Sequence, residues 1–435
     1  MKRTFCSFPV HDFLQVKEQM LSWANQFSIC CFLDDHQYRL PEHSFECILA
    51  ANAQSILRAG PHNAFELLQI FIDQHNDWCF GHLGYDLKNG IEALESGNTD
   101  LLKFDDLFFF VPEFILILRD TELLVGMKAP GHETIANAVF NAPPIPRGAG
   151  LHIEIKSRFS RPDYINTVHK LQQHILRGDC YEINFCQEFY HENAVIDPLQ
   201  VYRSLSNESP NPFSCYYKLE DKYLLCASPE RYLRKTGNKV ISQPIKGTMH
   251  RNGSNAGADI LNKDALRQSA KERSENIMIV DLVRNDLAKV CIEGSVKVDE
   301  LTGIYAFPQV YQMISTISGE IHNQASLTDL FKATFPMGSM TGAPKKRVMQ
   351  LIEQYERTRR GLFSGSVGYI SPERNIDFNV VIRSILYNAS NRYLSFQTGS
   401  AITYYSNAEA EYEECILKAA AIKKVLNSDI QHFIG

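Results

Sequence analysis

No stretch of the sequence is apolar over a length that could cross a membrane. The longest apolar run, residues 107–118, is interrupted by Pro112 and Glu113, whereas a membrane-spanning helix needs about 20 apolar residues. We interpret this run as two short buried strands. Near the N-terminus, charged residues from Asp12 onward interrupt any hydrophobic region of a secretion signal. The sequence therefore predicts a soluble, cytoplasmic protein without a membrane partner.

An excess of positive charge is also missing. The formal net charge is −6, with 22% charged and 44% hydrophobic residues, whereas a general nucleic-acid binder usually carries a basic excess. The composition is that of an ordinary globular protein, and 435 residues allow one to three domains. We expect no nucleic-acid partner and a small substrate.

Cysteine motifs are missing as well. The eleven cysteines include no C-x-x-C pair, and Cys30-Cys31 lies within an apolar run, which indicates reduced and mostly buried thiols. No cysteine has the Gly-x-Cys-x-Gly surroundings of a nucleophile. The chain therefore carries no candidate glutaminase.

A Pro- and Gly-rich segment, residues 141–150, separates two regions. It predicts an N-terminal α+β region over residues 1–145 and a catalytic domain over residues 150–435. Strand-like runs alternate with irregularly spaced helices and there is no internal repeat, so the expected fold class is α+β, with a large antiparallel sheet system flanked by helices.

Local patterns in the second region predict particular elements. Ser160 is a candidate N-cap for a helix that ends at Gly178. The next run, Cys180 to Phe189, alternates apolar and polar residues and predicts a strand with one polar face. Further strands are expected at 223–227, 239–242, 365–370, 380–387 and 393–398.

Two pairs of glutamates occur at helical spacing. Glu272 and Glu275 are three residues apart, and so are Glu411 and Glu414, so each pair occupies one face of a helix. Ser406 and Glu409 would form a capping box for the second helix. The two pairs could meet around a hard cation, although spacing alone favours two solvated helix faces.

Three other features could carry chemistry. The Gly-rich run from Gly338 to Pro344 leads into a helix, whose N-terminal amides could bind an anion, or it is an ordinary junction. Lys246, in Pro-Ile-Lys-Gly-Thr after a strand, is an inert surface charge or, if desolvated, a nucleophile that has lost its proton. Glu230 follows another strand and could act as an acid or belong to a turn.

Taken together, the ordered motifs resemble the chorismate-utilising enzyme family from about residue 155 to residue 425. The matching stretches are Ser228–Glu230, Pro244–Thr248, Glu272–Asp286, Gly338–Lys345, Arg360–Gly368, Ile382–Ser384 and Glu411–Lys418. Gly84-Tyr85-Asp86 and Phe32-Leu33-Asp34 resemble the family's N-terminal region more loosely. The resemblance implies a chorismate-binding enzyme fold.

The resemblance also implies roles by position. Glu275 and Glu414 would bind Mg²⁺ directly, and Glu272 and Glu411 would assist through waters. Glu230 would be the general acid that protonates the departing C4 hydroxyl. The expected substrate-binding residues are Gly338, Thr341, Gly342, Arg383, Gly399 and Lys418.

Lys246 implies a particular branch of the family. The anthranilate-forming branch has Ala at this position, whereas the branch that makes 4-amino-4-deoxychorismate, for p-aminobenzoate and folate biosynthesis, has Lys, which is expected to attack C2. Glu182 stands where the latter branch usually has Gln and where the isochorismate-forming branch has a water-activating Lys. Ammonia would come from a separate glutamine amidotransferase subunit.

Two departures leave other functions open. Gln312 replaces a family His and cannot shuttle a proton near pH 7, and Phe363 replaces a Tyr of some relatives. The alternatives are the anthranilate-forming activity and a non-catalytic chorismate- or tryptophan-binding protein. Asp34 could belong to an aromatic amino-acid pocket in the first region.

Overall fold

The structure, a computed structural model, describes residues 2–38, 42, 45–146, 151–251, 255–307 and 310–427. Its helices are α1 (Phe13–Ala24), α2 (Ala64–His75), α3 (Lys88–Glu92), α4 (His132–Phe140), α5 (Arg161–Leu176), α6 (Pro198–Glu208), α7 (Ala256–Gln268), α8 (Ala270–Ala288), α9 (Leu327–Thr334), α10 (Lys345–Tyr355), α11 (Ala408–Lys418) and α12 (Ala420–Leu426), with short 3-10 helices η1 (Tyr85–Leu87) and η2 (Gly338–Met340). No helix among the described residues is long and apolar enough to cross a membrane.

The strands all belong to one branched sheet, in which every strand pairing is antiparallel. They are β1 (Thr4–Pro9), β2 (Ile29–Asp34), β3 (Cys47–Ala59), β4 (Cys79–Leu83), β5 (Leu107–Arg119), β6 (Glu122–Met127), β7 (Lys156–Ser157), β8 (Glu182–His191), β9 (Phe213–Leu219), β10 (Lys222–Ser228), β11 (Arg231–Thr236), β12 (Lys239–Gln243), β13 (Ile245–His250), β14 (Lys297–Ala306), β15 (Val310–Glu320), β16 (Gly342–Ala343), β17 (Ser366–Ile370), β18 (Ile376–Asn379), β19 (Ser384–Asn388) and β20 (Tyr393–Ile402).

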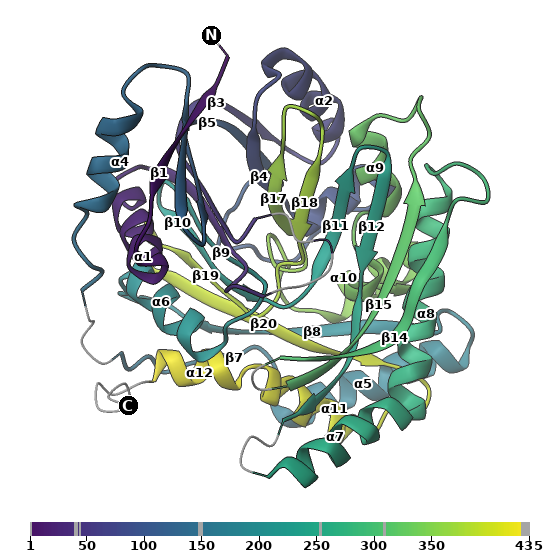
Figure 1. Cartoon of the computed structure of the whole chain (residues 1–435). Coiled ribbons are helices and arrows are strands. Elements are labelled where there is room, and N and C mark those ends of the chain that lie inside the picture. The colour runs from purple at the N-terminus through teal and green to yellow at the C-terminus, as the bar shows by residue number, and fades with distance from the viewer. Residues whose placement is uncertain are drawn as a thin grey trace.

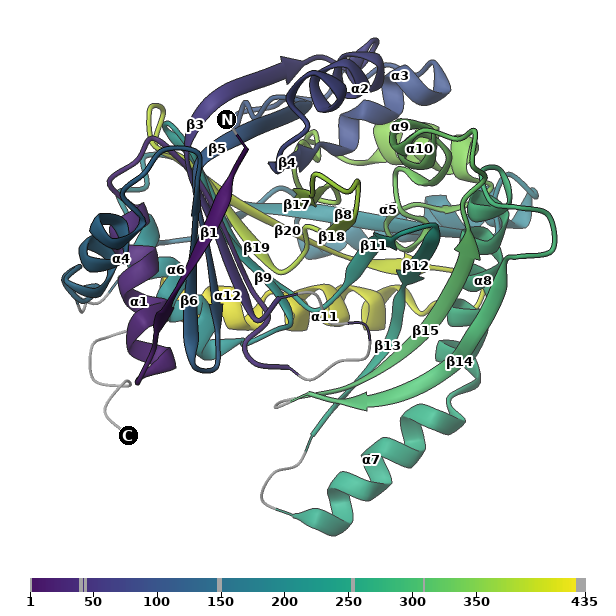
Figure 2. The same cartoon turned by 45° about the horizontal axis from the view of Figure 1, so that its top comes forward.

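The sheet divides at β5 and folds into a sandwich (Figures 1 and 2). One branch runs β6-β5-β3-β2-β9-β10-β19-β20-β8. The other leaves β5 through β4 and continues β17-β18-β11-β12-β15, and β13 and β14 both pair with β15. Helices cover the outer faces of both branches. The predicted α+β class with a large antiparallel sheet sandwich is confirmed.

Two hydrophobic cores follow from this arrangement, because consecutive residues of a strand point to opposite faces. Cys31 faces the core between the two branches, whereas Cys30 belongs to the core under α1, α5, α6 and α11. All eleven cysteines are free and ten of them are buried, as expected. The strand pairs β2–β9 and β4–β17 connect the two predicted regions. The boundary itself stays a prediction, and residues 147–150 of the predicted linker lie outside the described residues.

Three local predictions were wrong. The apolar run at 107–118 is one long strand, β5, because β3 pairs along its whole length and shifts register opposite Pro112. The expected strand at 380–387 begins only at Ser384, since Arg383 has a positive φ of 52°. Helix α11 has Asn407 as its N-cap instead of Ser406, because the Asn407 side chain accepts a hydrogen bond from the Ala410 amide.

The predicted helix after Ser160 and the strand before Phe189 are confirmed as α5 and β8. The polar face of β8 is buried, however, and Glu182 is 1% exposed. A polar strand face that is shielded from bulk water indicates that it borders an internal site.

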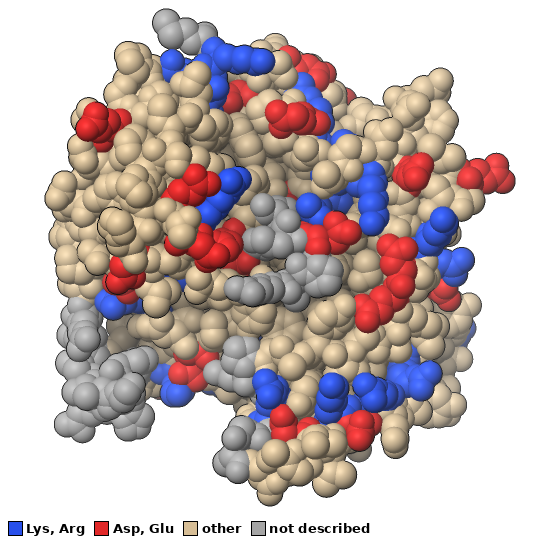
Figure 3. All heavy atoms as spheres, in the orientation of Figure 1, with Lys and Arg blue, Asp and Glu red and all other residues tan. Residues whose placement is uncertain are grey.

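On the face of the molecule shown in Figure 3, acidic and basic side chains are interspersed.

Candidate active site

A cavity of about 550 Å³ lies where β13, α8 and α11 come together (Figure 2). A cavity of this size accommodates a small molecule. Eight predicted site residues line it: Glu230, Lys246, Glu272, Glu275, Arg383, Gly399, Glu414 and Lys418. Residues that are more than 180 positions apart in the sequence thus meet at one site.

Four predicted residues lie outside this lining: Glu411, which lies on α11 and pairs with Lys271, and three residues of the Gly-rich loop. Gly338 borders a smaller pocket on the other side of Ser339. Thr341 is fully buried, and its hydroxyl donates to the Met337 carbonyl at 3.1 Å. Gly342 has a φ of 141°, and a Cβ there would stand 2.1 Å from the Glu182 carbonyl oxygen. These three residues shape the loop that holds β16 against β8; their role in binding substrate stays a prediction.

Lys246 lies inside the cavity and is paired with Glu182. Its Nζ donates to Glu182 Oε1 at 2.8 Å, and the two side chains are 10% and 1% exposed. Burial lowers the pKa of Lys246, but the carboxylates of Glu182, Glu275 and Glu230 outweigh it and raise the pKa well above its ordinary value. The alternative in which desolvation removes the proton from this lysine does not fit this arrangement, because the three carboxylates raise its pKa. Lys246 is an ammonium and needs a proton acceptor before it can act as a nucleophile.

Glu230 follows β10 and is 4% exposed. Burial raises its pKa to about 7, and the Ser339 hydroxyl, which donates to Glu230 Oε1 at 2.6 Å, opposes part of that shift. A carboxyl group with this pKa holds its proton in a large fraction of molecules at neutral pH. It can therefore act as a general acid.

The two predicted glutamate pairs come together where α8 faces α11. Lys271 lies between them, with its Nζ 2.9 Å from Glu411 Oε1, 3.9 Å from Glu275 Oε1 and 4.0 Å from Glu414 Oε2. Burial raises the pKa of Glu275 to about 8. Burial also acts to raise the pKa of Glu414, but Lys418 and Lys271 outweigh it and hold that pKa below its ordinary value. The cluster is thus acidic, with a lysine at its centre.

Two features of this cluster fit a divalent cation. Glu275 Oε1 and Glu411 Oε2 are buried and make no hydrogen bond, although a buried carboxylate oxygen normally has a partner. The ammonium of Lys271 occupies the space between the helices as a stand-in cation. The described residues contain no preformed group of three or more His, Cys, Asp or Glu side chains that could hold a metal. Mg²⁺ does not require one, because it binds through one or two carboxylates and keeps several waters.

Cationic groups line the neighbouring wall. Lys418 Nζ contacts Glu414 Oε1 at 2.6 Å and donates to the Gly399 carbonyl at 2.9 Å. Arg383 Nη1 donates to the Lys418 carbonyl at 3.3 Å. Burial lowers the pKa of Arg383, and Glu414 counteracts the effect. This wall can bind anionic groups beside the acidic cluster.

Several residues that hold the site together were not identified from the sequence. Arg360 is 2% exposed and donates to the Met340 carbonyl, the Asn184 carbonyl and Glu356, so it ties the η2 loop to β8. Ser339 orients Glu230. Ser339 and Arg360 lie within recognised motifs, but Glu230 and Asn184, which they contact, are more than 100 positions away, and only the fold reveals these contacts.

The two departures from the family pattern also line the cavity. Gln312 lies on β15 opposite Thr248 of β13 and is 4% exposed. Its Oε1 has no hydrogen-bond partner. Phe363 borders the same space. An amide oxygen that faces the cavity can accept a hydrogen bond, but it cannot carry a proton at neutral pH.

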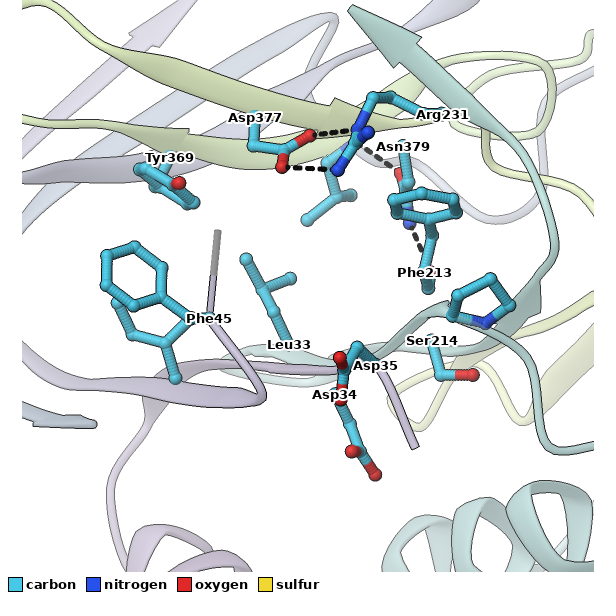
Figure 4. Close-up of a pocket in the computed structure, with 13 residues that line it drawn as sticks. Leu33, Asp34, Asp35, Phe45, Phe213, Ser214, Arg231, Tyr369, Asp377 and Asn379 are labelled. Atoms are coloured by element: carbon cyan, nitrogen blue, oxygen red, sulfur yellow. Dashed lines mark hydrogen bonds and ion pairs between the residues drawn. The ribbon is translucent and has the colours of Figure 1, made fainter. Parts of the chain in front are cut away.

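Asp34 lies in a separate pocket of about 60 Å³. Figure 4 shows Asp34 and Asp35 on one side of it and the ion pair of Arg231 with Asp377 on the other. Asp34 is bound by Lys17 at 2.9 Å. Whether this pocket takes an aromatic amino acid stays a prediction.

The family of this chain follows from comparison with known proteins. A family model described as chorismate binding enzyme matches residues 31–424, and the chain belongs to this family of chorismate-utilising enzymes. It is 33% identical over 350 residues to "Aminodeoxychorismate synthase component 1" of Escherichia coli. The matched stretch covers 80% of this chain and 76% of the relative. It is 34% identical over 361 residues to "Probable aminodeoxychorismate synthase, chloroplastic" of Oryza sativa, which covers 81% of this chain but only 37% of that longer relative.

Relatives with another name are similar too. "Anthranilate synthase component 1" of Thermus thermophilus is 31% identical over 397 residues, covering 87% of this chain and 85% of the relative. The structure of anthranilate synthase component I from Streptococcus pneumoniae superposes with a TM-score of 0.76 over 89% of this chain and 94% of that one, at 24% identity. This likeness establishes the fold.

Proposed function

We propose that this chain is the aminating component of an aminodeoxychorismate synthase, which converts chorismate and ammonia to 4-amino-4-deoxychorismate. The observation that carries the proposal is Lys246, a buried amine in the same cavity as the protonatable Glu230 and the acidic cluster. The similarity to the Escherichia coli relative supports the choice of reaction.

In this proposal, Glu275 and Glu414 hold Mg²⁺ directly, and Glu272 and Glu411 assist through waters. This role suits the buried oxygens of Glu275 and Glu411, which make no hydrogen bond. It also suits Glu275 and Glu414, which approach Lys271 from α8 and α11. When bound, the ion supplies positive charge that fixes a substrate carboxylate. Arg383 and Lys418 supply further positive charge, and Gly399 and the amides around Gly338, Thr341 and Gly342 complete the expected contacts.

The protein's side chains then move the protons. Glu230 donates its proton to the C4 hydroxyl, which leaves as water while Lys246 Nζ forms a bond to C2. Ammonia next adds at C4 and the C2–N bond to Lys246 breaks, which regenerates the amine. Lys246 must first release to solvent the proton that its ion pair with Glu182, at 2.8 Å, holds on the amine.

The ammonia is proposed to come from a separate glutamine amidotransferase subunit. The Escherichia coli relative is named as component 1 of its synthase, which supports a second component here. The product would serve p-aminobenzoate and folate biosynthesis. Anthranilate formation is the second candidate, favoured by the extent of the match to the Thermus relative.

Substitution of Lys246 tests the covalent role. Lys246→Ala alone would leave Glu182 buried without its partner, at a cost of about 3 kcal/mol in folding free energy. We therefore compare Lys246→Ala/Glu182→Gln with Glu182→Gln, which retains the lysine. The double variant is expected to lose amination by at least about a hundredfold, or about 2.7 kcal/mol in activation free energy, whereas Glu182→Gln keeps turning over.

Initial rates would be measured with chorismate, Mg²⁺ and an ammonium salt, after thermal unfolding has verified that both variants are folded. Equal rates for the two variants would remove the covalent role of Lys246 and leave direct attack by ammonia.

A further inference from the structure

We propose that Lys271 is a resident counter-ion of the acidic cluster, which a divalent cation must displace in order to bind. This inference rests on the metal site of the proposed function and assigns a role to a residue outside it. The Lys271 ammonium is within 4.0 Å of the carboxylates of Glu275, Glu411 and Glu414. It therefore occupies the space that a cation shared by α8 and α11 would take.

Lys271 has one local partner, Glu275, four residues later in the same helix at 3.9 Å, but its position at the start of the helix is unfavourable. Ser269 is the N-cap of α8 and accepts a hydrogen bond from the Glu272 amide, so Lys271 lies in the first turn. A positive charge at a helix N-terminus is unfavourable, because the helix dipole is positive there. The compensating interaction is with Glu411, which is 1% exposed and belongs to another helix. Lys271 thus offsets the negative charge of the cluster, although its own charge is unfavourable at the N-terminus of α8.

Lys271 is also the more easily displaced of the two lysines at the cluster. Lys418 is fixed by the Gly399 carbonyl in addition to Glu414. The Lys271 ammonium contacts the carboxylates of Glu275, Glu411 and Glu414, and its side chain is 44% exposed. A long, half-exposed lysine can swing its ammonium into solvent without burying a charge. Exchange with a hydrated cation therefore needs no backbone movement.

Removal of the Lys271 charge should consequently strengthen metal binding. A unit charge about 4 Å from the ligands competes directly with the cation, and its loss is expected to tighten Mg²⁺ binding about tenfold or more. Lys271→Met keeps the length of the side chain. Lys271→Gln removes the charge but keeps a donor for Glu411, which guards against a destabilised Lys271→Met protein.

Calorimetric titration of MgCl₂ into the full chain without chorismate tests this inference. The matched control is Lys289→Met at the other end of α8, where Lys289 pairs with Asp286 at 2.8 Å and is similarly exposed. Tighter binding in both Lys271 variants, with no change in the control, is the expected result. The Mg²⁺-induced rise in unfolding temperature should increase in the same order.

Unchanged or weaker binding in the Lys271 variants would overturn the counter-ion role while leaving the metal site intact. Absence of Mg²⁺ binding in the wild type and in every variant would instead overturn the metal site of the proposed function, and the counter-ion role with it. The two failures are therefore distinguishable.

Discussion

At the scale of single residues, the chemistry of the cavity depends on which groups hold protons. Glu182 keeps Lys246 charged, whereas burial raises the pKa of Glu230 to about 7, so that about half of the molecules carry this proton at neutral pH. One cavity thus holds a carboxyl group that can donate a proton, Glu230, and a protonated amine, Lys246, because the neighbours of the two groups differ. Burial sets the direction of the pKa shift of Glu230, whereas for Lys246 the neighbouring carboxylates reverse the effect of burial.

The raised pKa of Glu230 predicts a dependence of stability on pH. Its folded-state pKa of about 7 exceeds the ordinary value of 4.5, so its contribution to stability is complete below pH 4.5 and is lost as the pH rises through 7. Glu230→Gln stays neutral at every pH and avoids this loss. The free energy of unfolding of Glu230→Gln, relative to that of the wild type, should therefore rise by up to about 3 kcal/mol between pH 4.5 and pH 8.

Thermal or denaturant unfolding at pH 5 and pH 8 measures this difference, and the same variant should lose the acid's contribution to turnover, about a hundredfold. A stability difference that is equal at both pH values would show that Glu230 does not titrate in this range.

At the scale of elements, the short strand β16 connects the Gly-rich loop to β8. The sequence predicted the loop, the following helix and its apolar face, because Gly and Pro mark such junctions. It did not predict that Gly342 packs against the Glu182 backbone, since that contact depends on the register between β16 and β8. The hydrogen bonds of Arg360 to the Met340 and Asn184 carbonyls could not be found from spacing either, because they join segments that only the fold brings together.

Gly342→Ala should therefore disturb the site from a position outside the cavity lining. The new Cβ would meet the Glu182 carbonyl at 2.1 Å, and the φ of 141° is unfavourable for alanine. We expect a loss of several kcal/mol in unfolding free energy and a displaced Glu182–Lys246 pair. Gly97→Ala, where a Cβ meets nothing within 4 Å, is the matched control and should change stability by less than about 0.5 kcal/mol.

Chemical denaturation of both variants compares them directly. Similar stabilities for Gly342→Ala and Gly97→Ala would mean that β16 moves freely away from β8, and that the loop does not position Glu182.

At the scale of the whole molecule, the sheet explains why the sequence predicted the site's members better than its layout. Helices and alternating strands leave periodic patterns, so the α+β class and elements such as α5, β8, β12 and β20 were predictable. The division of the sheet at β5 was not, because pairings such as β4–β17 join residues almost 300 positions apart. That closure brings β13, α8 and α11 around one cavity.

The identity of the product tests the account most directly. The full chain would be incubated with chorismate, Mg²⁺ and an ammonium salt, and the product identified by mass spectrometry. The account predicts 4-amino-4-deoxychorismate, which keeps the enolpyruvyl side chain and gains an amino group. Anthranilate, which has lost that side chain as pyruvate, would contradict it.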